Sequence, residues 1–206
     1  MIAVFHPLMS EIGGSEIRRK KNFDLISYPI GVGREQALKM LERHFHYCCS
    51  TITSALIIGV GGGIKDDLRL GDIVLCNEIS AKGQSSIFSD GNLLSAAAEL
   101  LFERKEEFRI GKNFTVLDFG DPIVISGATV VDMEDYWVGL ELQNRGIPFL
   151  AVRIISDLIL EKLSVEELRE RIPSFGASLR KRFVIPFLLN CEDTKNDILK
   201  SCIIAD

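Results

Sequence analysis

The stretch ALIIGVGGGIKDDLRLGDIVL, residues 55–75, decides how the chain folds. An apolar run of strand length ends in four glycines between positions 59 and 63, and a second apolar run begins after Gly71-Asp72. Glycine adopts positive φ readily and lets another molecule approach the backbone without a Cβ in the way. We therefore expect a strand, a glycine loop and a second strand, with the loop at the sheet edge where α/β proteins bind ligands.

Two common phosphate-binding motifs do not fit this stretch. A P-loop requires Gly-Lys-Ser/Thr at the start of a helix, but Gly63 is followed by Ile64, Lys65 and Asp66. A Rossmann fingerprint requires a third glycine at position 64 and a helix after it, where a second strand is expected here. A tight turn between two core strands is the structural alternative to a ligand-binding loop.

Composition limits the class of protein. The 206 residues are 47% hydrophobic, enough for one sizeable core, and no Pro/Gly/Ser-rich linker divides them. We expect one α/β domain over residues 1–190 and leave the tail at 191–206 unassigned. The net charge is -5 and the basic residues are scattered, so a nucleic-acid partner is not expected. No apolar run is long enough to span a bilayer, so no membrane partner is expected either.

The cysteines give no metal or disulfide pattern. The five are odd in number, form no CxxC pair, and show no metal-ligand spacing with the three histidines. Together with the lack of an amino-terminal signal segment, they indicate reduced thiols and a cytoplasmic location. We expect neither a metal nor a cofactor.

Hydrophobic periodicity predicts strands alternating with helices. Besides the two strands on either side of the glycine loop, strands are expected at residues 2–5, 27–30, 114–117, 123–126, 129–133 and 147–155. Helices are expected at 34–49, 92–108 and 134–144, and from Ser164 to Asn190 with possible breaks at Pro173 and Pro186. Strands alternating with helices imply a mixed β-sheet flanked by helices on both faces.

Polar residues follow the ends of several predicted strands. If the strands are parallel, Glu134 and Asp157 share one sheet edge, and Glu11 and the glycine loop face the same edge. Paired carboxylates can break glycosidic bonds, one of them protonating the leaving group. Either residue could instead face a helix dipole, a role worth only ~0.3–1 kcal/mol. Arg153 needs a partner or the edge of its apolar strand, since a buried charge is costly.

These residues give the chain a resemblance to the nucleoside phosphorylase and nucleosidase superfamily. It is most similar to 5′-methylthioadenosine/S-adenosylhomocysteine nucleosidases and to futalosine and aminodeoxyfutalosine hydrolases. The glycine stretch followed by Leu70-Gly71-Asp72 resembles their glycine loop and Gly-Asp strand. Val131-Asp132-Met133-Glu134 resembles their ribose motif, and Arg153-Ile154-Ile155-Ser156-Asp157 resembles their base-site motif.

The resemblance implies a role for each matching residue. Glu134 would hold the ribose hydroxyls, with Met133 against the sugar. Asp157, steadied by Ser156, would donate a proton toward purine N7, while Glu11 and Arg153 would hold the attacking water. Further substrate-binding positions are Val60, Gly61, Ile123, Val124 and Val32. The family's homodimers imply a second copy near the 5′ side, where Val32 or Phe88 could contribute.

The sequence favours hydrolysis of a 5′-modified adenosine and leaves two alternatives open. Glu11 in the first segment suits water and repels phosphate, and Asp157 suits a 6-aminopurine. The substrate candidates are methylthioadenosine, S-adenosylhomocysteine and aminodeoxyfutalosine, the last a precursor in menaquinone biosynthesis. The alternatives are a phosphorylase and a nucleoside-binding relative without activity.

The sequence departs from the family pattern at three places. Val60 replaces a hydroxyl residue of the family, and Ile123-Val124 replaces a more aromatic pair. The segment between Ile125 and Val131 is shorter than in the family.

Overall fold

The computed structural model describes residues 2–7, 25–48, 52–118, 127–159, 161 and 163–191. Its strands are β1 (Ile2–His6), β2 (Leu25–Pro29), β3 (Ser54–Gly63), β4 (Ile73–Ala81), β5 (Ile87–Phe88), β6 (Phe108–Thr115), β7 (Val130–Asp132) and β8 (Phe149–Leu158). Its helices are α1 (Arg34–Cys48), α2 (Gly91–Glu103), α3 (Asp135–Asn144) and α4 (Val165–Leu179), followed by a π-helical segment (Arg180–Val184) and α-helical residues 185–191.

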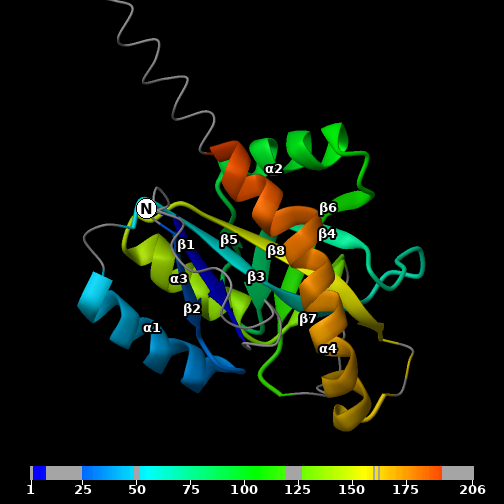
Figure 1. Cartoon of the computed structure of the whole chain (residues 1–206). Coiled ribbons are helices and arrows are strands. Elements are labelled where there is room, and N and C mark those ends of the chain that lie inside the picture. The colour runs from blue at the N-terminus through cyan, green and yellow to red at the C-terminus, as the bar shows by residue number, and fades with distance from the viewer. Residues whose placement is uncertain are drawn as a thin grey trace, which may run out of the picture.

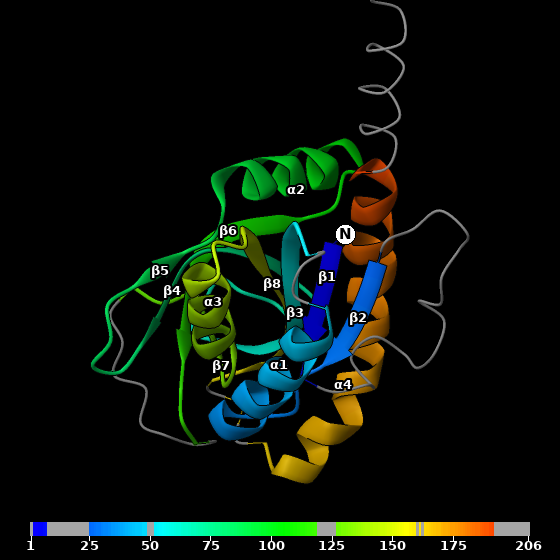
Figure 2. The same cartoon turned by 90° about the vertical axis from the view of Figure 1, so that its left-hand side faces the viewer.

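The eight strands form one mixed sheet whose centre closes on itself. β3 pairs with β7 on one side and β8 on the other, β8 pairs with β4, and β4 continues through β6 back to β7. β1 and β2 extend this ring in parallel beyond β3. Helices α1 and α3 cover one face, while α2 and α4 cover the other (Figures 1 and 2). The predicted single α/β sheet with helices on both faces is confirmed.

Successive side chains of a strand point to opposite faces of the sheet, and they form one hydrophobic core on each face. Ala55 and Ile57 of β3 face α1 and α3, while Leu56 and Ile58 face α2 and α4. β8 is buried at every position from Phe149 to Ser156, which agrees with the near-continuous apolar run expected for a strand covered on both sides.

The predicted glycine loop is wrong, because β3 continues as a strand through Gly63. None of its glycines has a positive φ. Their function is close packing: a Cβ on Gly61 would lie 2.5 Å from Val130 Cγ2, and a Cβ on Gly62 would lie 3.1 Å from Asp157 Oδ2. The missing side chains therefore let β7 and β8 crowd against β3 on its two sides.

The predicted helix at 92–108 is too long. Asp90 caps α2 by accepting hydrogen bonds from the N–H groups of Asn92 and Leu93, but the helix ends at Glu103. Lys105 has a φ of 57°, the left-handed conformation that turns the chain toward β6. The apolar residues after this turn belong to β6, which therefore begins earlier than predicted. The predicted strand at 123–126 lies outside the described residues.

The carboxyl-terminal helix begins as predicted and tolerates its first proline. Ser164 and Glu167 form a reciprocal capping box at its start. Pro173 lies inside α4 without breaking it, on an exposed side where water can hydrate the freed carbonyl. The π-helical segment ends at Val184, two residues before Pro186, and Ile185 N–H donates to Arg180 O. No described helix combines the length and apolar character needed to cross a membrane.

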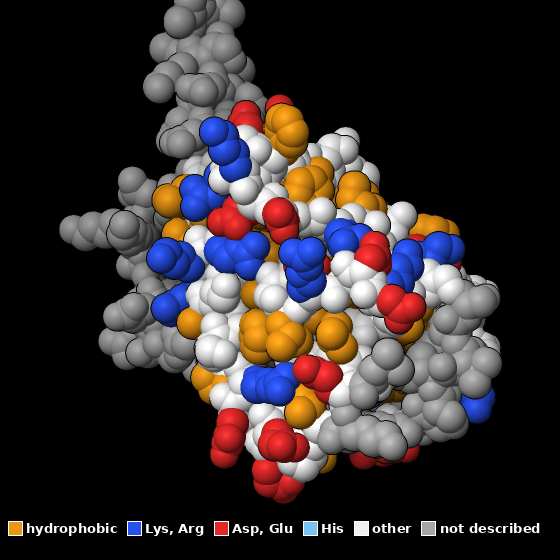
Figure 3. All heavy atoms as spheres, turned by 90° about the vertical axis from the view of Figure 1, so that its right-hand side faces the viewer, with side chains coloured by type: hydrophobic (Ala, Val, Ile, Leu, Met, Phe, Trp, Pro, Cys, Tyr) orange, Lys and Arg blue, Asp and Glu red, His pale blue; other side chains and the backbone are white. Residues whose placement is uncertain are grey.

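The face that carries α4 has a mixed surface. Lys and Arg side chains alternate with Asp and Glu around a small apolar area (Figure 3). Charges of both signs on this face produce no broad field of one sign, in keeping with the modest net charge of -5.

The close packing around β3 predicts that adding a methyl group at Gly61 lowers the stability of the protein. Gly61→Ala should lower the free energy of unfolding by about 1–3 kcal/mol, because its Cβ would meet Val130 and lie 3.0 Å from Val131 O. Gly91→Ala is the matched control, since nothing lies within 4 Å of its Cβ. Urea denaturation measures both. Equal stability of the two variants would contradict the crowding of β7 against β3.

Candidate active site

β7 and the end of β8 both pair with the last residues of β3. Gly62 pairs with Val131 of β7 on one side and with Asp157 of β8 on the other. Two strand spacings separate the flanking backbones by about 10 Å. The parallel arrangement behind the sequence prediction is wrong, because β7 runs antiparallel to β3 while β8 runs parallel. The ends nevertheless converge, since β7 is short and its pairs with β3 are at Gly62 and Gly63.

A bulge in β8 sets the direction of Asp157. The register shifts between Gly61 and Gly62, so Ser156 is an extra residue between the pairs Gly61–Ile155 and Gly62–Asp157. The Asp157 carboxylate consequently lies over Gly62, where a side chain would obstruct it. Asp157 therefore belongs to a strand, and the alternative role as a helix amino-terminal carboxylate does not apply.

The environment of Asp157 favours its protonated form. Burial raises the pKa of this carboxyl above its usual value, and the nearby Glu161 adds to the effect. Ser156 Oγ opposes the rise in pKa by donating a hydrogen bond to Oδ1 at 2.8 Å. A carboxyl with a raised pKa can carry a proton closer to neutral pH and deliver it to a ligand.

Glu134 stands at the start of α3 but does not cap it. Its side chain makes no capping bond. Asp132 performs that function, accepting the N–H groups of Glu134 at 3.2 Å and Asp135 at 2.7 Å. Glu134 Oε1 instead accepts the N–H of Gly33 at 2.7 Å, in the turn before α1, where Gly33 has a φ of 82°. The carboxylate is thus held between two helix amino termini.

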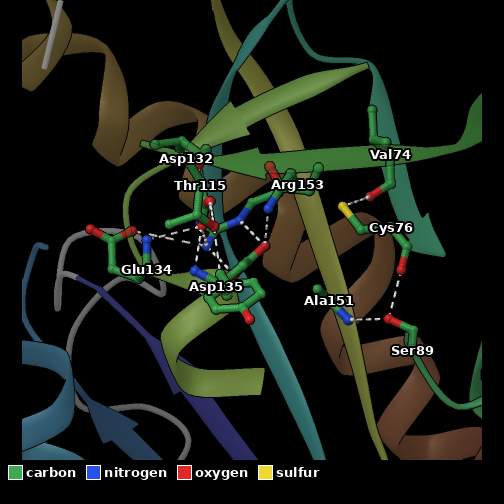
Figure 4. A network of polar contacts seen from close by, with 12 residues as sticks. Val74, Cys76, Ser89, Thr115, Asp132, Glu134, Asp135, Ala151 and Arg153 are labelled. Carbon is green, nitrogen blue, oxygen red and sulfur yellow. Dashed lines mark hydrogen bonds and ion pairs between the residues drawn. The ribbon is translucent and has the colours of Figure 1, made fainter. Parts of the chain in front are cut away.

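Arg153 lies at the centre of a buried ion cluster (Figure 4). Its side chain is fully buried, with Nη2 2.6 Å from Asp132 Oδ2 and Nε 3.0 Å from Asp135 Oδ2. Nη2 also donates to Asp135 Oδ1, and Nη1 donates to Val60 O at 3.1 Å. Glu134 Oε2 is 4.0 Å from Nη2. All three guanidinium nitrogens therefore have partners within the protein.

Two polar side chains from β6 complete this cluster. Asn113 Nδ2 donates to Asp135 Oδ2 at 2.6 Å, and Thr115 Oγ1 donates to Asp132 Oδ1 at 2.6 Å. Burial raises the pKa of Asp135 to about 7, although Arg153 favours its ionised form. Burial opposes the charge of Arg153, but Asp135 and Asp132 raise its pKa above the usual value. The guanidinium is permanently charged.

The other predicted site residues differ in how deeply they are buried. Ser156 and Gly61 are buried, Met133 and Val60 are half-buried, and Val32 is 39% exposed in the turn before α1. Val60 packs toward the core under α2 and α4, and its carbonyl contacts Arg153. Three predicted residues, Glu11, Ile123 and Val124, lie outside the described residues. Among the residues that are described, no cluster of His, Cys, Asp or Glu could hold a metal ion.

Sequence reasoning missed the partners of Arg153. The arginine in an apolar strand indicated that a buried counter-charge was needed. Asp132 and Asp135 flank Glu134 in DMED and were the available carboxylates, but only Glu134 was singled out. Asn113 and Thr115 carried no signal, because contacts between β6 and α3 depend on the tertiary fold.

Comparisons with known proteins identify the fold. Neither the family models nor the curated proteins compared with this chain give a match. Solved structures do, and those with the most similar fold include 5′-methylthioadenosine/S-adenosylhomocysteine nucleosidases and a futalosine hydrolase.

Three of these structures illustrate the likeness. One is assigned as a 5′-methylthioadenosine/S-adenosylhomocysteine nucleosidase of Borrelia burgdorferi bound to adenine, with TM-score 0.79, 19% identity, and coverage of 93% of this chain and 100% of that one. The corresponding nucleosidase of Campylobacter jejuni has TM-score 0.76, 18% identity and coverage of 93% and 98%. The futalosine hydrolase of Helicobacter pylori has TM-score 0.76, 16% identity and coverage of 92% and 97%. The chain has the fold of these enzymes.

The buried cluster predicts a large loss of stability when its cation is removed. Arg153→Met should lower the free energy of unfolding by about 3–5 kcal/mol, since it leaves Asp132 and Asp135 as unpaired buried charges. Arg109→Met is the control, because its ion pair with Asp67 is exposed and should be worth at most about 1 kcal/mol. Denaturant titration at neutral pH compares them. A loss for Arg153→Met no larger than that of the control would contradict the role of the cluster.

Proposed function

We propose that the protein is a purine nucleosidase that hydrolyses the N-glycosidic bond of a 5′-modified adenosine and releases adenine. The main support is the convergence of Asp157 and the Glu134 segment on the two sides of Gly62, with Asp157 half-buried and its pKa raised. The shared fold of nucleosidases, one of them bound to adenine, adds to this support. We further propose a homodimer in the cytoplasm.

Asp157 would act as the general acid. Its raised pKa lets it hold a proton that it donates to N7 of the purine, while Ser156 Oγ stabilises the carboxylate that remains. The electron pair of the bond between C1′ and the base passes to adenine, and the sugar becomes an oxocarbenium-like cation. Water oxygen then bonds to C1′ and releases a proton, which balances the hydrolysis.

Glu134 would bind the sugar. Its Oε1 accepts the N–H of Gly33 at 2.7 Å, and its Oε2 lies 4.0 Å from Arg153 Nη2. Each carboxylate oxygen can accept more than one hydrogen bond, so the anchored carboxylate would also accept from ribose hydroxyls. Met133, the half-buried neighbour, would pack on the sugar. Val60 and Gly61 would supply backbone near the ribose, and Ile123 and Val124 would contact the base.

Water suits this site better than phosphate as the nucleophile. Asp132, Glu134 and Asp135 surround a single cation, Arg153, so the cluster carries excess negative charge when all three carboxylates are ionised. Arg153 already donates from each nitrogen to protein acceptors and would help to place water, with Glu11, through its remaining N–H capacity. A phosphate dianion would meet repulsion in such surroundings.

Adenine release is the direct test of this function. Methylthioadenosine, S-adenosylhomocysteine and aminodeoxyfutalosine should be tested separately, with and without phosphate, and at least one should yield free adenine without phosphate. Asp157→Asn should reduce kcat by about 10²–10⁴-fold because it removes the proton donor. Glu103→Gln, an exposed change on α2, is the control. Strict phosphate dependence would make the protein a phosphorylase, and binding without release would make it an inactive relative.

The pH dependence follows from the same residue. Burial raises the Asp157 pKa, so the proton donor is present below that pKa and is lost as pH rises through it. We expect kcat for adenine release to fall on the alkaline side, and the fall to disappear in Asp157→Asn, whose residual rate lacks this donor. A kcat that rises with pH across the neutral range would contradict Asp157 as the acid.

A further inference from the structure

The chain turns back at the end of β8, directly after Asp157. Ile159 N–H still donates to Gly63 O at 2.9 Å, so the pairing with β3 continues to this point. Glu161 then bonds to Leu158 twice: its backbone N–H donates to Leu158 O at 2.7 Å, and its Oε2 accepts Leu158 N–H at 3.2 Å. These bonds hold the Glu161 carboxylate close to the strand end that carries Asp157.

Arg171 of α4 connects this turn to the bulge in β8. Its Nη1 donates to Glu161 Oε2 at 3.0 Å and, more loosely, to Ser156 O at 3.5 Å. One nitrogen therefore contacts the residue before Asp157 and the carboxylate that follows it. The side chains of Arg171 and Glu161 are each 33% exposed, so this ion pair lies at the surface, unlike the buried cluster of Arg153.

We propose that Arg171 and Glu161 are positioning residues for proton donation by Asp157, because their ion pair fixes two charges of opposite sign beside the proton donor. This inference rests on the proposed function. Arg171 cannot supply the proton itself, since a guanidinium stays charged in proteins. The pair would therefore act on the reaction through Asp157, by placing its backbone and by the electric field at its carboxyl group.

The two charges act on Asp157 in opposite directions. Burial is the main cause of its raised pKa; Glu161 raises the pKa further, while Arg171 lowers it. The neighbour of Asp157 on β3 is Gly62, which carries no side chain, and Glu134 belongs to the segment on the other side of that glycine. Removal of either member of the pair should therefore move the Asp157 pKa in a direction that is known in advance.

The test compares the pH profiles of kcat for adenine release in Glu161→Gln, Arg171→Gln and the double variant, from about pH 5 to about pH 9. Glutamine at position 161 keeps an oxygen that can accept from Leu158 N–H, so the charge changes more than the geometry. On the alkaline limb, relative to the acid plateau, kcat should fall about threefold in Glu161→Gln and rise about threefold in Arg171→Gln. The double variant should resemble the wild type, because the two effects cancel.

A second measurement does not depend on catalysis. Titration of the Asp157 carboxyl by ¹³C NMR in the full chain, with the signal assigned through Asp157→Asn, should show its midpoint at lower pH in Glu161→Gln and at higher pH in Arg171→Gln. Arg169→Gln and Glu170→Gln remove the same charges at exposed positions of α4 and serve as matched controls. Both controls should keep the wild-type profile.

Opposite displacements of the alkaline limb in the two single variants would support the inference, since a purely structural role would lower kcat at every pH and leave the limb in place. Unchanged limbs, or limbs that move in the same direction, would overturn it while adenine release leaves the proposed function intact. If Arg171→Gln fails to fold, an unchanged limb in Glu161→Gln is enough to overturn it. Absence of adenine release from the wild type would instead remove the proposed function, and the carboxyl titration would still decide whether the pair acts on Asp157.

Discussion

A buried arginine with two aspartates is the interaction on which the candidate site depends. Arg153 joins β8 to the end of β7 through Asp132, to α3 through Asp135, and to β3 through Val60 O. Burying such charges is costly unless each finds a partner, and here β6 supplies further hydrogen bonds through Asn113 and Thr115. The cluster therefore fixes the relative positions of four strands and a helix, and Glu134 lies directly beside it.

The backbone of β3 makes room for this arrangement. Gly61 and Gly62 lack the side chains that would collide with β7 and with the Asp157 carboxylate. The bulge at Ser156 then changes the direction of the strand next to that glycine pair. Close packing on one side and a register shift on the other bring the proposed proton donor and the proposed sugar-binding carboxylate to the same end of β3. The glycines are thus a steric requirement of the site.

Periodicity and capping residues were sufficient to predict most elements of the fold. The helix predicted at 34–49, the helix start at Ser164 and the apolar β8 are local features that the structure confirms. The glycines of β3 were misassigned as a loop, since the crowding that extends the strand comes from residues about 70 and 95 positions away. Glu134, Arg153 and Asp157 could be singled out from their motifs. The partners Asn113 and Thr115 could not, because their contacts exist only once β6 is assembled against β7 and α3.

In the proposed nucleosidase each charged group has a separate role. Asp157 carries a proton, Glu134 accepts sugar hydroxyls, and Arg153 with its aspartates holds the geometry. The most direct test is a crystal structure of the full chain with adenine and a ribose analogue bound. We expect Asp157 to contact N7 of the purine and Glu134 to contact the ribose hydroxyls, on the two sides of Gly62. Adenine bound elsewhere, with Asp157 and Glu134 facing separate parts of the surface, would contradict the proposed function.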